Sequence, residues 1–322
     1  MFTGKRVLVA GGTGMIGIPL VEMLIKEGAQ VRIASLDEPS RAHPAAEFIS
    51  IDLFSFENCL TVCEGMDFVF NLLGVKGSPA MTRTKPASFF VPTLTLSLNL
   101  MEAARRRGVK GFLYASSIAV YSPAEILYED EVWRTFPSGN DKFAGWAKRM
   151  GELQAEAYQI QYGWDQIAIV RPGNTYGPYD NFDRENAMVI PSLIKRAVDG
   201  ENPLRVWGDG SARRNFIHAR DVARGMILVA KKMPGQPVNL ASDVEISIKE
   251  LVEIIIRQLD KKPQVLWDCS KPTGDQNRIM DISRAQSMGF QPQTSLEDGI
   301  KEVMNWYRKN RNSVNNRYDV FV

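Results

Sequence analysis

Residues that build metal centres and disulfide frameworks are scarce in this chain. Its 322 residues include only two histidines and three cysteines, Cys59, Cys63 and Cys269. Three is an odd number, and no pair among the cysteines has the spacing of a metal-binding motif. We therefore expect buried, reduced thiols at Cys59 and Cys63, with neither a metal site nor a disulfide.

An excess of charge of one sign and a long apolar run are also missing. The 39 basic and 37 acidic side chains nearly cancel to a net charge of +2, which predicts no basic field for nucleic acid. No apolar stretch reaches the roughly 18 residues that span a membrane, and the first residues lack the features of a signal peptide. We therefore expect a cytoplasmic protein that binds neither nucleic acid nor membrane.

Short apolar runs alternate with helical patterns through the first half of the chain. The runs typical of strands are Val7–Ala10, Val31–Ala34, Phe48–Ile51, Phe68–Leu72, Gly111–Ala115 and Ile167–Val170. The helical patterns between them are Ile18–Lys26, Phe56–Cys63, Leu94–Arg107 and Phe143–Tyr162. This alternation predicts an α/β fold, a Rossmann-type doubly wound parallel sheet with helices on both faces.

The most informative motif lies at the first strand–helix junction. Gly11, Gly14 and Gly17 are spaced G-x-x-G-x-x-G between the first strand and the first helix. Gly11 permits a tight turn, Gly14 lets a pyrophosphate approach the backbone, and Gly17 allows close packing of helix on strand. The helix N-terminus adds unpaired N–H groups and the positive end of its dipole. The motif predicts a dinucleotide-binding site, with a purely structural turn as the alternative.

The second half of the chain has a different pattern. After Arg171, loops rich in Gly, Pro, Asn and Asp separate short helices, which we expect at Ile190–Val198, Ala219–Lys231 and Ile248–Leu259. Such a pattern fits a smaller lobe over the carboxyl edge of the sheet, where these folds bind ligands. We therefore divide the chain into a dinucleotide-binding domain at 1–170, a mainly substrate-binding lobe at 171–310 and a loose tail at 311–322.

Several further segments form an ordered set. They are GGTGMIG at 11–17, Asp52-Leu53, SSIAVY at 116–121, WAKRMGE at 146–152, RPGNTYGP at 171–178 and GDGSARRNF at 208–216. In this order they resemble the extended short-chain dehydrogenase/reductases of the NAD-dependent epimerase/dehydratase family, which act on nucleotide sugars. The segment YGPYDNFDRENAMVIPSL at 176–193 looks most like the GDP-fucose synthase branch. The resemblance runs from Lys5 to about Tyr307 and implies a GDP-linked sugar as substrate.

The resemblance also implies NAD or NADP as cofactor. The implied binding positions are Gly11, Thr13, Gly14, Met15, Ile16, Gly17, Ser35, Asp37, Arg41, Asp52, Leu53, Leu72, Leu73, Gly74 and Lys148. Asp37 suits the ribose of NAD, whereas Ser35 and Arg41 suit the 2′-phosphate of NADP. A plain turn at residues 37–40 is a further alternative. Asp52 matches the family's adenine contact, and a helix N-cap before Phe54 is its alternative.

At the catalytic position the chain departs from the family. The family uses a Tyr, activated by a Lys one helical turn later, and a Ser or Thr hydroxyl that holds the reacting oxygen. Lys148 and Ser117 match the Lys and the hydroxyl residue, but Ala144 stands at the Tyr position. Three interpretations remain open: a Tyr substituted in an inactive protein, a different proton donor (Tyr121, Lys76 or a water), or a binding protein without turnover.

The resemblance further implies positions that contact the nucleotide sugar. They are Lys76, Ser117, Asn174, Val189, Arg214 and Arg278. The two arginines are candidates for the diphosphate because a guanidinium binds two oxygens at once, and Arg214 is preferred to Arg278 because of its register in the motif. His218 is expected to pack or form hydrogen bonds and not to catalyse.

Other branches of the family use residues that this chain lacks. GDP-fucose synthases invert sugar carbons with a Cys and a His, where this chain has Ala119 and Met188. The dehydratases carry an acidic pair where this chain has Ile118 and Ala119. Double epimerisation and dehydration are thereby disfavoured, which leaves oxidation, reduction or 4-epimerisation at a sugar carbon.

Taken together, the sequence predicts an NAD(P)-dependent nucleotide-sugar epimerase or oxidoreductase with an atypical site. The alternatives are a non-catalytic dinucleotide or nucleotide-sugar binding protein and an enzyme for small carbonyl compounds. By the same resemblance we expect a homodimer through the helices Leu94–Arg107 and Phe143–Tyr162. The apolar residues that support this interface are Leu94, Leu96, Leu98, Met101, Trp146, Met150 and Leu153.

Overall fold

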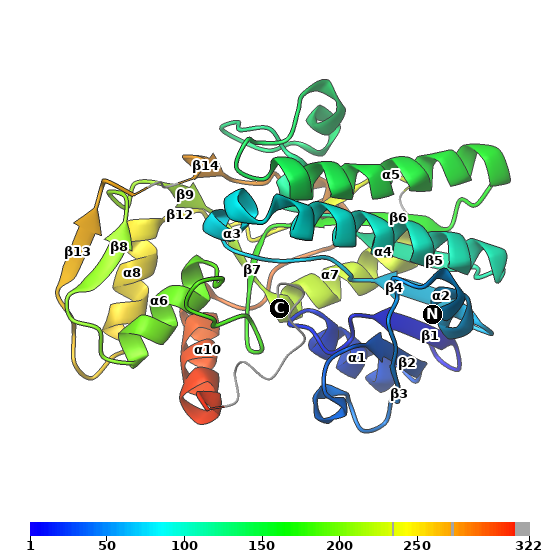
Figure 1. Ribbon diagram of the computed structural model, residues 1–322, viewed down its shortest axis with the longest axis horizontal. Helices are drawn as coiled ribbons and strands as arrows, with labels where there is room; N and C mark the ends of the chain where they lie inside the picture. The colour runs from blue at the N-terminus through cyan, green and yellow to red at the C-terminus, as the bar shows by residue number, and fades with distance from the viewer. Residues whose placement is uncertain (234, 272–273, 313–322) are drawn as a thin grey trace.

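A seven-stranded sheet in which all neighbouring strands are parallel forms the centre of the molecule (Figure 1). The computed structural model describes residues 1–233, 235–271 and 274–312. In spatial order the strands are β11 (Val238–Leu240), β6 (Ile167–Pro172), β5 (Gly111–Ala115), β4 (Phe68–Asn71), β1 (Arg6–Ala10), β2 (Gln30–Ser35) and β3 (Glu47–Ser50). Apart from the exposed Arg6 at the start of β1 and the polar Asn71 at the end of β4, the residues of β1, β4 and β5 are apolar and buried, as is typical of parallel strands covered on both faces.

Helices cover both faces of this sheet. On one face lie α1 (Gly17–Lys26) and α7 (Ala219–Lys232), whose apolar residues share a core with the strands. On the other lie α2 (Phe56–Cys63), α4 (Pro86–Arg106) and α5 (Lys142–Tyr162). In Figure 1, α4 and α5 run side by side along one edge of the view. The predicted fold class, a Rossmann-type doubly wound sheet with a smaller C-terminal lobe, is confirmed.

The smaller lobe lies beyond the carboxyl edge of the sheet (Figure 1). Its core joins α6 (Val189–Val198), α8 (Ile248–Arg257) and α10 (Leu296–Asn310) to the parallel pair β8 (Leu204–Trp207) and β13 (Val265–Asp268). Inside it, Phe182 stacks on Tyr307 with ring centroids 4.9 Å apart. The shorter elements are α3 (Pro79–Thr84), β7 (Asn174–Tyr176), β9 (Arg213–Arg214), β10 (Phe216–His218), β12 (Ile246–Ser247), β14 (Asn277–Arg278) and α9 (Ser283–Ser287), with 3₁₀ turns at 39–41, 118–120 and 129–134.

One helix begins earlier than its pattern predicts. The sequence pattern predicts a start at Leu94, after Pro92, a residue that usually breaks a helix. Instead α4 begins with Pro86, a residue suited to a first turn, and contains Pro92. Phe89, Pro92 and Thr93 are all buried, so tertiary packing holds these turns helical despite the missing N–H.

The chain crosses the expected boundary at residue 170 more than once. β6 runs on to Pro172, and after the first lobe elements α7 and β11 return to the large sheet. Most of the predicted tail, residues 313–322, lies outside the described residues. The division into two domains stays a prediction. Within the described ranges no helix is both long and apolar enough to cross a membrane.

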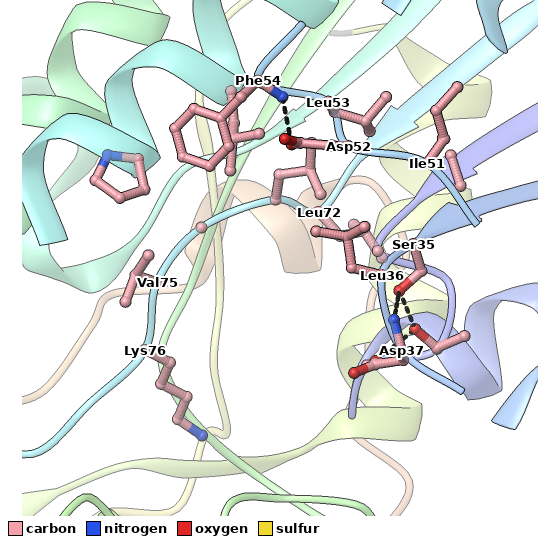
Figure 2. Close-up of a pocket in the computed structure, with 18 of the residues that line it drawn as sticks. Ser35, Leu36, Asp37, Ile51, Asp52, Leu53, Phe54, Leu72, Val75 and Lys76 are labelled. Carbon is pink, nitrogen blue, oxygen red and sulfur yellow. Dashed lines mark hydrogen bonds between the residues drawn. The ribbon is translucent and has the colours of Figure 1, made fainter. Parts of the chain in front are cut away.

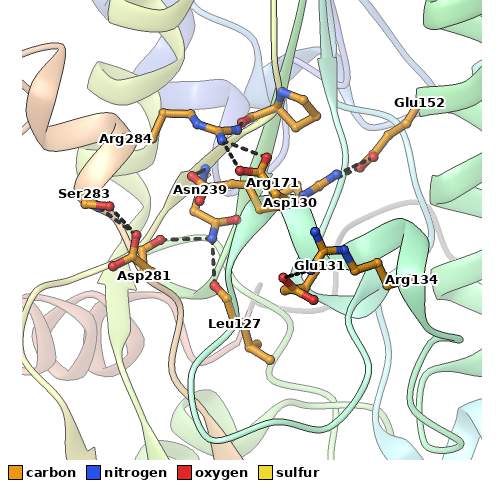
Figure 3. A network of polar contacts seen from close by, with 12 residues as sticks. Leu127, Asp130, Glu131, Arg134, Glu152, Arg171, Asn239, Asp281, Ser283 and Arg284 are labelled. Atoms are coloured by element: carbon orange, nitrogen blue, oxygen red, sulfur yellow. Dashed lines mark hydrogen bonds and ion pairs between the residues drawn. The ribbon is translucent and has the colours of Figure 1, made fainter.

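A buried polar network fixes α5 against the sheet (Figure 3). Arg171, at the end of β6, donates to both carboxylate oxygens of Glu152, from Nε at 2.9 Å and from Nη2 at 2.7 Å. Ser116, just after β5, donates from Oγ to Glu152 Oε1 at 2.5 Å. Because this bidentate pair is buried and its hydrogen bonds are satisfied, it sets the position of α5, including Lys148 one turn before Glu152.

Candidate active site

The glycine motif forms the predicted turn between β1 and α1. Gly11 has a φ of +82°, in the region where glycine is favoured. A Cβ on Gly17 would overlap the Gly11 carbonyl oxygen, so glycine is required for this close approach of helix to strand. A Cβ on Gly14 would meet only the Gly11 carbonyl oxygen, at 3.3 Å, so its outer side faces the adjoining cavities. These positions confirm the predicted geometry of the turn.

A cavity of about 310 Å³ extends from this turn along the carboxyl ends of β1, β2 and β4 (Figure 2). We call it the dinucleotide compartment. The predicted residues that line it are Gly11, Thr13, Gly14, Ser35, Asp37, Asp52, Leu53, Leu72, Leu73, Gly74 and Lys76. Residues that the sequence did not assign to the cofactor complete the lining: Ala34, Leu36, Ile51, Phe54, Val75, Pro92, Leu96, Asn181, Asp183 and Asn186. Of these, Leu96 was expected at the dimer interface, but it lies in the wall of this cavity.

Hydrogen bonds fix the end of β2 at one side of this compartment. The Thr13 hydroxyl donates to Asp37 Oδ2 at 2.7 Å and lies 2.7 Å from Ser35 Oγ. Ser35 Oγ also accepts from the Asp37 N–H at 3.1 Å (Figure 2). Arg41 donates from Nη2 to the Thr13 carbonyl at 3.2 Å and lies 3.8 Å from the Asp37 carboxylate. The carboxylate of Asp37 is therefore held in the wall of the cavity with Arg41 beside it.

Asp52 is the residue that the family resemblance assigns to the adenine contact. Its Oδ1 accepts a hydrogen bond from the Phe54 N–H at 2.9 Å (Figure 2). The N-cap of α2 is not Asp52 but Ser55, whose hydroxyl accepts from the Asn58 N–H. Asp52 thus closes a local turn, and it lines the dinucleotide compartment together with Leu53.

A second cavity, also of about 310 Å³, continues from the first. We call it the reaction compartment. Gly11, Gly14 and residues 72–76 line both cavities, so the two are joined. The other predicted residues that line the reaction compartment are Met15, Ile16, Gly17, Ser117, Ala144, Lys148, Asn174, Val189 and Arg278. Segments far apart in the sequence therefore meet at this edge of the sheet.

Lys148 projects from α5 into the wall between the compartments. Its Nζ donates to the carbonyl oxygens of Leu73 at 2.8 Å and Ala115 at 2.7 Å. Burial lowers the pKa of this amine to about 7, while the charge of Glu152 acts in the opposite direction. The two carbonyl partners fix the nitrogen and leave room on it for one further hydrogen bond.

Ser117 and Ala144 face the same cavity from neighbouring elements. Ser117 Oγ accepts from the Ala119 N–H at 3.1 Å, and its hydroxyl hydrogen is available to a ligand. A Cβ on Gly145 would overlap the Ala119 carbonyl oxygen, so the start of α5 packs directly on the turn at residues 118–120. Ala144 leaves open the space that a tyrosine ring would fill.

Charged and amide groups line the side nearest the lobe. Lys76 Nζ donates to Asp180 Oδ1 at 2.8 Å, and Arg278 Nη1 lies 2.5 Å from Asp141 Oδ2. The Nδ2 group of Asn174 is buried and has no hydrogen-bond partner among the described residues. An unpaired buried amide costs free energy, so it indicates that a ligand completes the site.

The two predicted diphosphate arginines are placed differently. The Arg214 guanidinium is buried and donates to the carbonyl oxygens of Arg213 at 2.6 Å, Gln276 at 3.1 Å and Asp275 at 2.8 Å. Burial lowers its pKa to about 10. Its neighbour across the strand pair, Arg278, lines the reaction compartment. The geometry therefore turns Arg278, and not Arg214, toward a ligand in that compartment.

Two residues considered from the sequence serve the scaffold. The Tyr121 hydroxyl donates to Asn239 Oδ1 at 2.6 Å and accepts from Arg171, and burial raises its pKa to about 12. It belongs to the buried network, so it does not replace the missing phenol. His218 Nδ1 accepts from the Arg220 N–H at 3.2 Å and caps α7, while burial lowers its pKa to about 4.

The sequence missed Asp141, which lines the reaction compartment one helical turn before Ala144. The sequence spacing could have indicated Asp141, because residues three and four apart share a helix face and Asp141 lies three residues before Ala144. In the part of the chain that the structure describes, no three His, Cys, Asp or Glu side chains are grouped so that they could hold a metal ion. Burial raises the pKa of Cys59 and of Cys63 to about 12, which keeps both thiols protonated and therefore unreactive.

Several known proteins are similar to this chain in sequence and in fold. GDP-L-fucose synthase 1 of Arabidopsis thaliana is 32% identical over 317 residues, which cover 95% of this chain and 94% of that protein. A dTDP-4-dehydro-6-deoxy-D-allose reductase from a Streptomyces species is 29% identical over 95% of this chain and 97% of that protein. The solved structure of MoeE5 in complex with UDP-glucuronic acid and NAD is 26% identical with a TM-score of 0.81, covering 95% of this chain and 99% of that one.

Residues 7–241 match the family described as "NAD dependent epimerase/dehydratase family". The match contains both compartments' main segments, from the glycine turn through Lys148 to β11. The relatives named above are a GDP-L-fucose synthase, a reductase of a dTDP-linked sugar and a protein whose structure holds UDP-glucuronic acid and NAD. With the joined compartments and the glycine turn described above, this identifies the chain as a member of the NAD-dependent epimerase/dehydratase family of nucleotide-sugar enzymes.

Proposed function

We propose that this protein catalyses hydride transfer between a nicotinamide dinucleotide and a ring carbon of a nucleotide-linked sugar. The observation that carries the proposal is the junction of the two compartments at residues 72–76, where Lys148 of the reaction compartment donates to the Leu73 carbonyl and Ser117 lies on the substrate side. A dinucleotide fits the first compartment because Gly14 leaves the backbone open and Asp37 and Asp52 stand in its wall. The unpaired amide of Asn174 supports a ligand in the second.

Each side chain of the reaction compartment has a distinct role in this proposal. The bound dinucleotide supplies or accepts the hydride. Lys148 holds the nicotinamide ribose through the free position on its nitrogen, and Ser117 donates a hydrogen bond to the reacting sugar oxygen. Asn174 and Arg278 bind the nucleotide sugar, Arg278 at the diphosphate. These groups orient the two ligands before any proton moves.

We further infer NAD as the preferred cofactor. The Asp37 carboxylate in the wall of the dinucleotide compartment suits a ribose with two hydroxyl groups and repels a 2′-phosphate. Arg41 lies close to the Asp37 carboxylate, so the positive charge of Arg41 is less available to a 2′-phosphate. The NAD in the related structure of MoeE5 supports the same choice.

A GDP-linked sugar is the proposed substrate class. Support comes from the segment at 176–193, which contributes Val189, Asn181, Asp183 and Asn186 to the cavity walls, and from the GDP-L-fucose synthase relative. Ala119 and Met188, which cannot transfer protons, both line the reaction compartment. Simple reduction, oxidation or 4-epimerisation is therefore proposed over double epimerisation.

The proposal is tested by mixing the protein with reduced nicotinamide cofactors and 4-keto sugars linked to GDP, UDP or dTDP. We expect the absorbance of NADH to fall, fastest with the GDP sugar, and Lys148→Met to abolish the change. The rival function is a binding protein without turnover. Calorimetric binding of both ligands together with constant NADH absorbance for every sugar would favour that rival.

We also propose a homodimer in which α4 and α5 of each subunit pack together. Exposed apolar side chains on these two helices support it, among them Leu98 (37% exposed) and Leu153 (45%). Met101 does not take part, because it is fully buried in the core between α4 and the sheet. Ile160, which is 79% exposed, extends the apolar surface along α5.

A further inference from the structure

A hydride transfer at a sugar carbon needs a group that exchanges a proton with the attached oxygen, and Ala144 cannot do so. The inference below rests on the proposed function. Among the described residues that line the reaction compartment, the ionisable ones are Lys76, Asp141, Lys148, Tyr176 and Arg278. A guanidinium stays protonated in proteins, so Arg278 is not the missing group.

The contacts of Tyr176, Lys76 and Lys148 argue against each of them as the group that exchanges the proton. The Tyr176 hydroxyl lies against α10, on the side away from the compartment. Lys76 is bound to Asp180 at 2.8 Å and lies at the junction with the dinucleotide compartment. Lys148 is held by two carbonyl oxygens and is already assigned to the ribose. Asp141 is the remaining group.

Asp141 is well placed on α5. It stands at the N-cap, one turn before Ala144, and Lys148 follows one turn after Ala144. All three line the reaction compartment, so they share one face of the helix. The small Ala144 side chain leaves a gap between the carboxylate and the amine. In the proposed reaction, the reacting sugar oxygen lies in that gap, next to Asp141, where a tyrosine ring at position 144 would obstruct it.

Arg278 links this carboxylate to substrate binding. Its Nη1 lies 2.5 Å from Asp141 Oδ2, and each side chain is largely buried. Arg278 also lines the compartment, where a diphosphate is a competing partner of the same charge as the carboxylate. When the guanidinium binds the diphosphate, it weakens its hold on Asp141. Substrate binding itself therefore makes the Asp141 carboxylate available to the sugar.

We propose that Asp141 is the proton-exchanging residue of this enzyme and that Arg278 is its counter-ion until the diphosphate binds. In the oxidising direction, the sugar O–H bond breaks and its proton bonds to the Asp141 carboxylate. The C–H bond breaks at the same carbon, its hydride reduces the nicotinamide dinucleotide, and the C=O double bond forms. In the reducing direction, protonated Asp141 returns the proton to the oxygen while the hydride returns to the carbon.

The first experiment measures turnover with saturating cofactor and sugar nucleotide. Asp141→Asn is expected to lower kcat by about 10²–10⁴-fold, the usual contribution of a positioned acid–base group, without raising KM. Asp141→Glu recovers part of the rate. Adding Ala144→Tyr to Asp141→Asn also recovers rate, because a phenol one turn from Lys148 is the alternative donor.

Asp275→Asn is the matched control. Asp275 Oδ1 accepts from Ser138 Oγ and Asn140 Nδ2, both at 2.8 Å, and thus ties the same segment before α5 to the lobe. A purely structural role of this segment would make the control as slow as Asp141→Asn. Equal losses in the two variants, or no recovery in Asp141→Glu and in the double variant, would overturn the proposal.

A second experiment is independent of turnover and of the cofactor. GDP and UDP are titrated into the cofactor-free protein by calorimetry. Asp141→Asn frees Arg278 and is expected to raise affinity for the preferred nucleotide several-fold, whereas Arg278→Met lowers it. Unchanged or weaker binding in Asp141→Asn would contradict the ion-pair exchange. If the wild type binds nucleotide with this pattern but transfers no hydride, the proposed function fails while the Arg278 assignment stands.

Discussion

The buried amine of Lys148 makes the stability of the folded protein depend on pH. Its pKa is about 7 in the folded chain, because burial disfavours the charge, and a lysine in an unfolded chain has a pKa near 10.4. Between these values the unfolded chain binds more protons, so the free energy of unfolding rises with pH. The expected slope from this residue approaches about 1.4 kcal/mol per pH unit.

This slope is measured as a difference between wild type and Lys148→Met, by denaturant unfolding of the cofactor-free protein from about pH 7 to about pH 9. The methionine does not titrate, so the stability of wild type relative to the variant should increase across that range. A pH-independent difference would show that Lys148 keeps its charge in the folded state.

The Asp37 side chain is expected to set cofactor preference. Asp37→Asn keeps the hydrogen bond from Thr13 but removes the charge that opposes a 2′-phosphate. We predict that the ratio of NAD to NADP affinity falls by about tenfold, equivalent to about 1.4 kcal/mol. Titrations with both cofactors measure it. Glu38→Gln, an exposed neighbour, removes the same charge and should leave the ratio unchanged; an equal effect there would contradict a specific role for Asp37.

Single residues also show what the sequence makes predictable in a site. The roles of Gly11 and Gly17 were predictable because glycines at this spacing between a strand and a helix form a tight turn with close packing of helix on strand. The motif favoured Arg214 over Arg278, whereas in the structure Arg278 lines the reaction compartment, because which guanidinium binds carbonyl oxygens depends on how β9 and β14 pair. Asp141 was missed because the family motif points to position 144, where the tyrosine is absent, and not to a neighbour one helical turn away.

At the scale of elements, the Arg171–Glu152 pair holds β6 to α5 (Figure 3). Arg171→Met leaves the Glu152 carboxylate buried without its partner, which costs about 3–5 kcal/mol of unfolding free energy. Arg134→Met is the control, since Arg134 and Glu131 are 2.7 Å apart but exposed, and such pairs contribute about 1 kcal/mol or less. Denaturant unfolding of both variants checks this; similar losses would contradict the account.

Elements of the large sheet were more predictable than those of the lobe. The strands and helices of the first half follow clear apolar periodicity, and β5 and α2 have the predicted bounds. The lobe's strands are only two to four residues long, as in β9, β12 and β13, and so carry no periodic signal. They pair because distant loops meet, and pairing of that kind is set by tertiary contacts.

At the scale of the whole molecule, the proposed dimer predicts a solution mass of twice the chain. Leu153→Glu should shift the protein to a monomer, because it places a charge in an apolar interface. Light scattering at micromolar concentration measures the mass. Val244→Glu is the control, since Val244 is also exposed but lies on the lobe. A monomeric wild type, or a dimer unaffected by Leu153→Glu, would contradict this arrangement.

In the proposed reaction, the joined compartments transfer a hydride to a nucleotide sugar although Ala144 replaces the expected phenol. The most direct test uses NADH with deuterium at the transferring carbon and a GDP-linked 4-keto sugar, followed by mass spectrometry of the recovered sugar. We predict that one deuterium appears on the sugar ring and that Lys148→Met prevents it. An unlabelled sugar, recovered under conditions in which both ligands are bound, would contradict the claim.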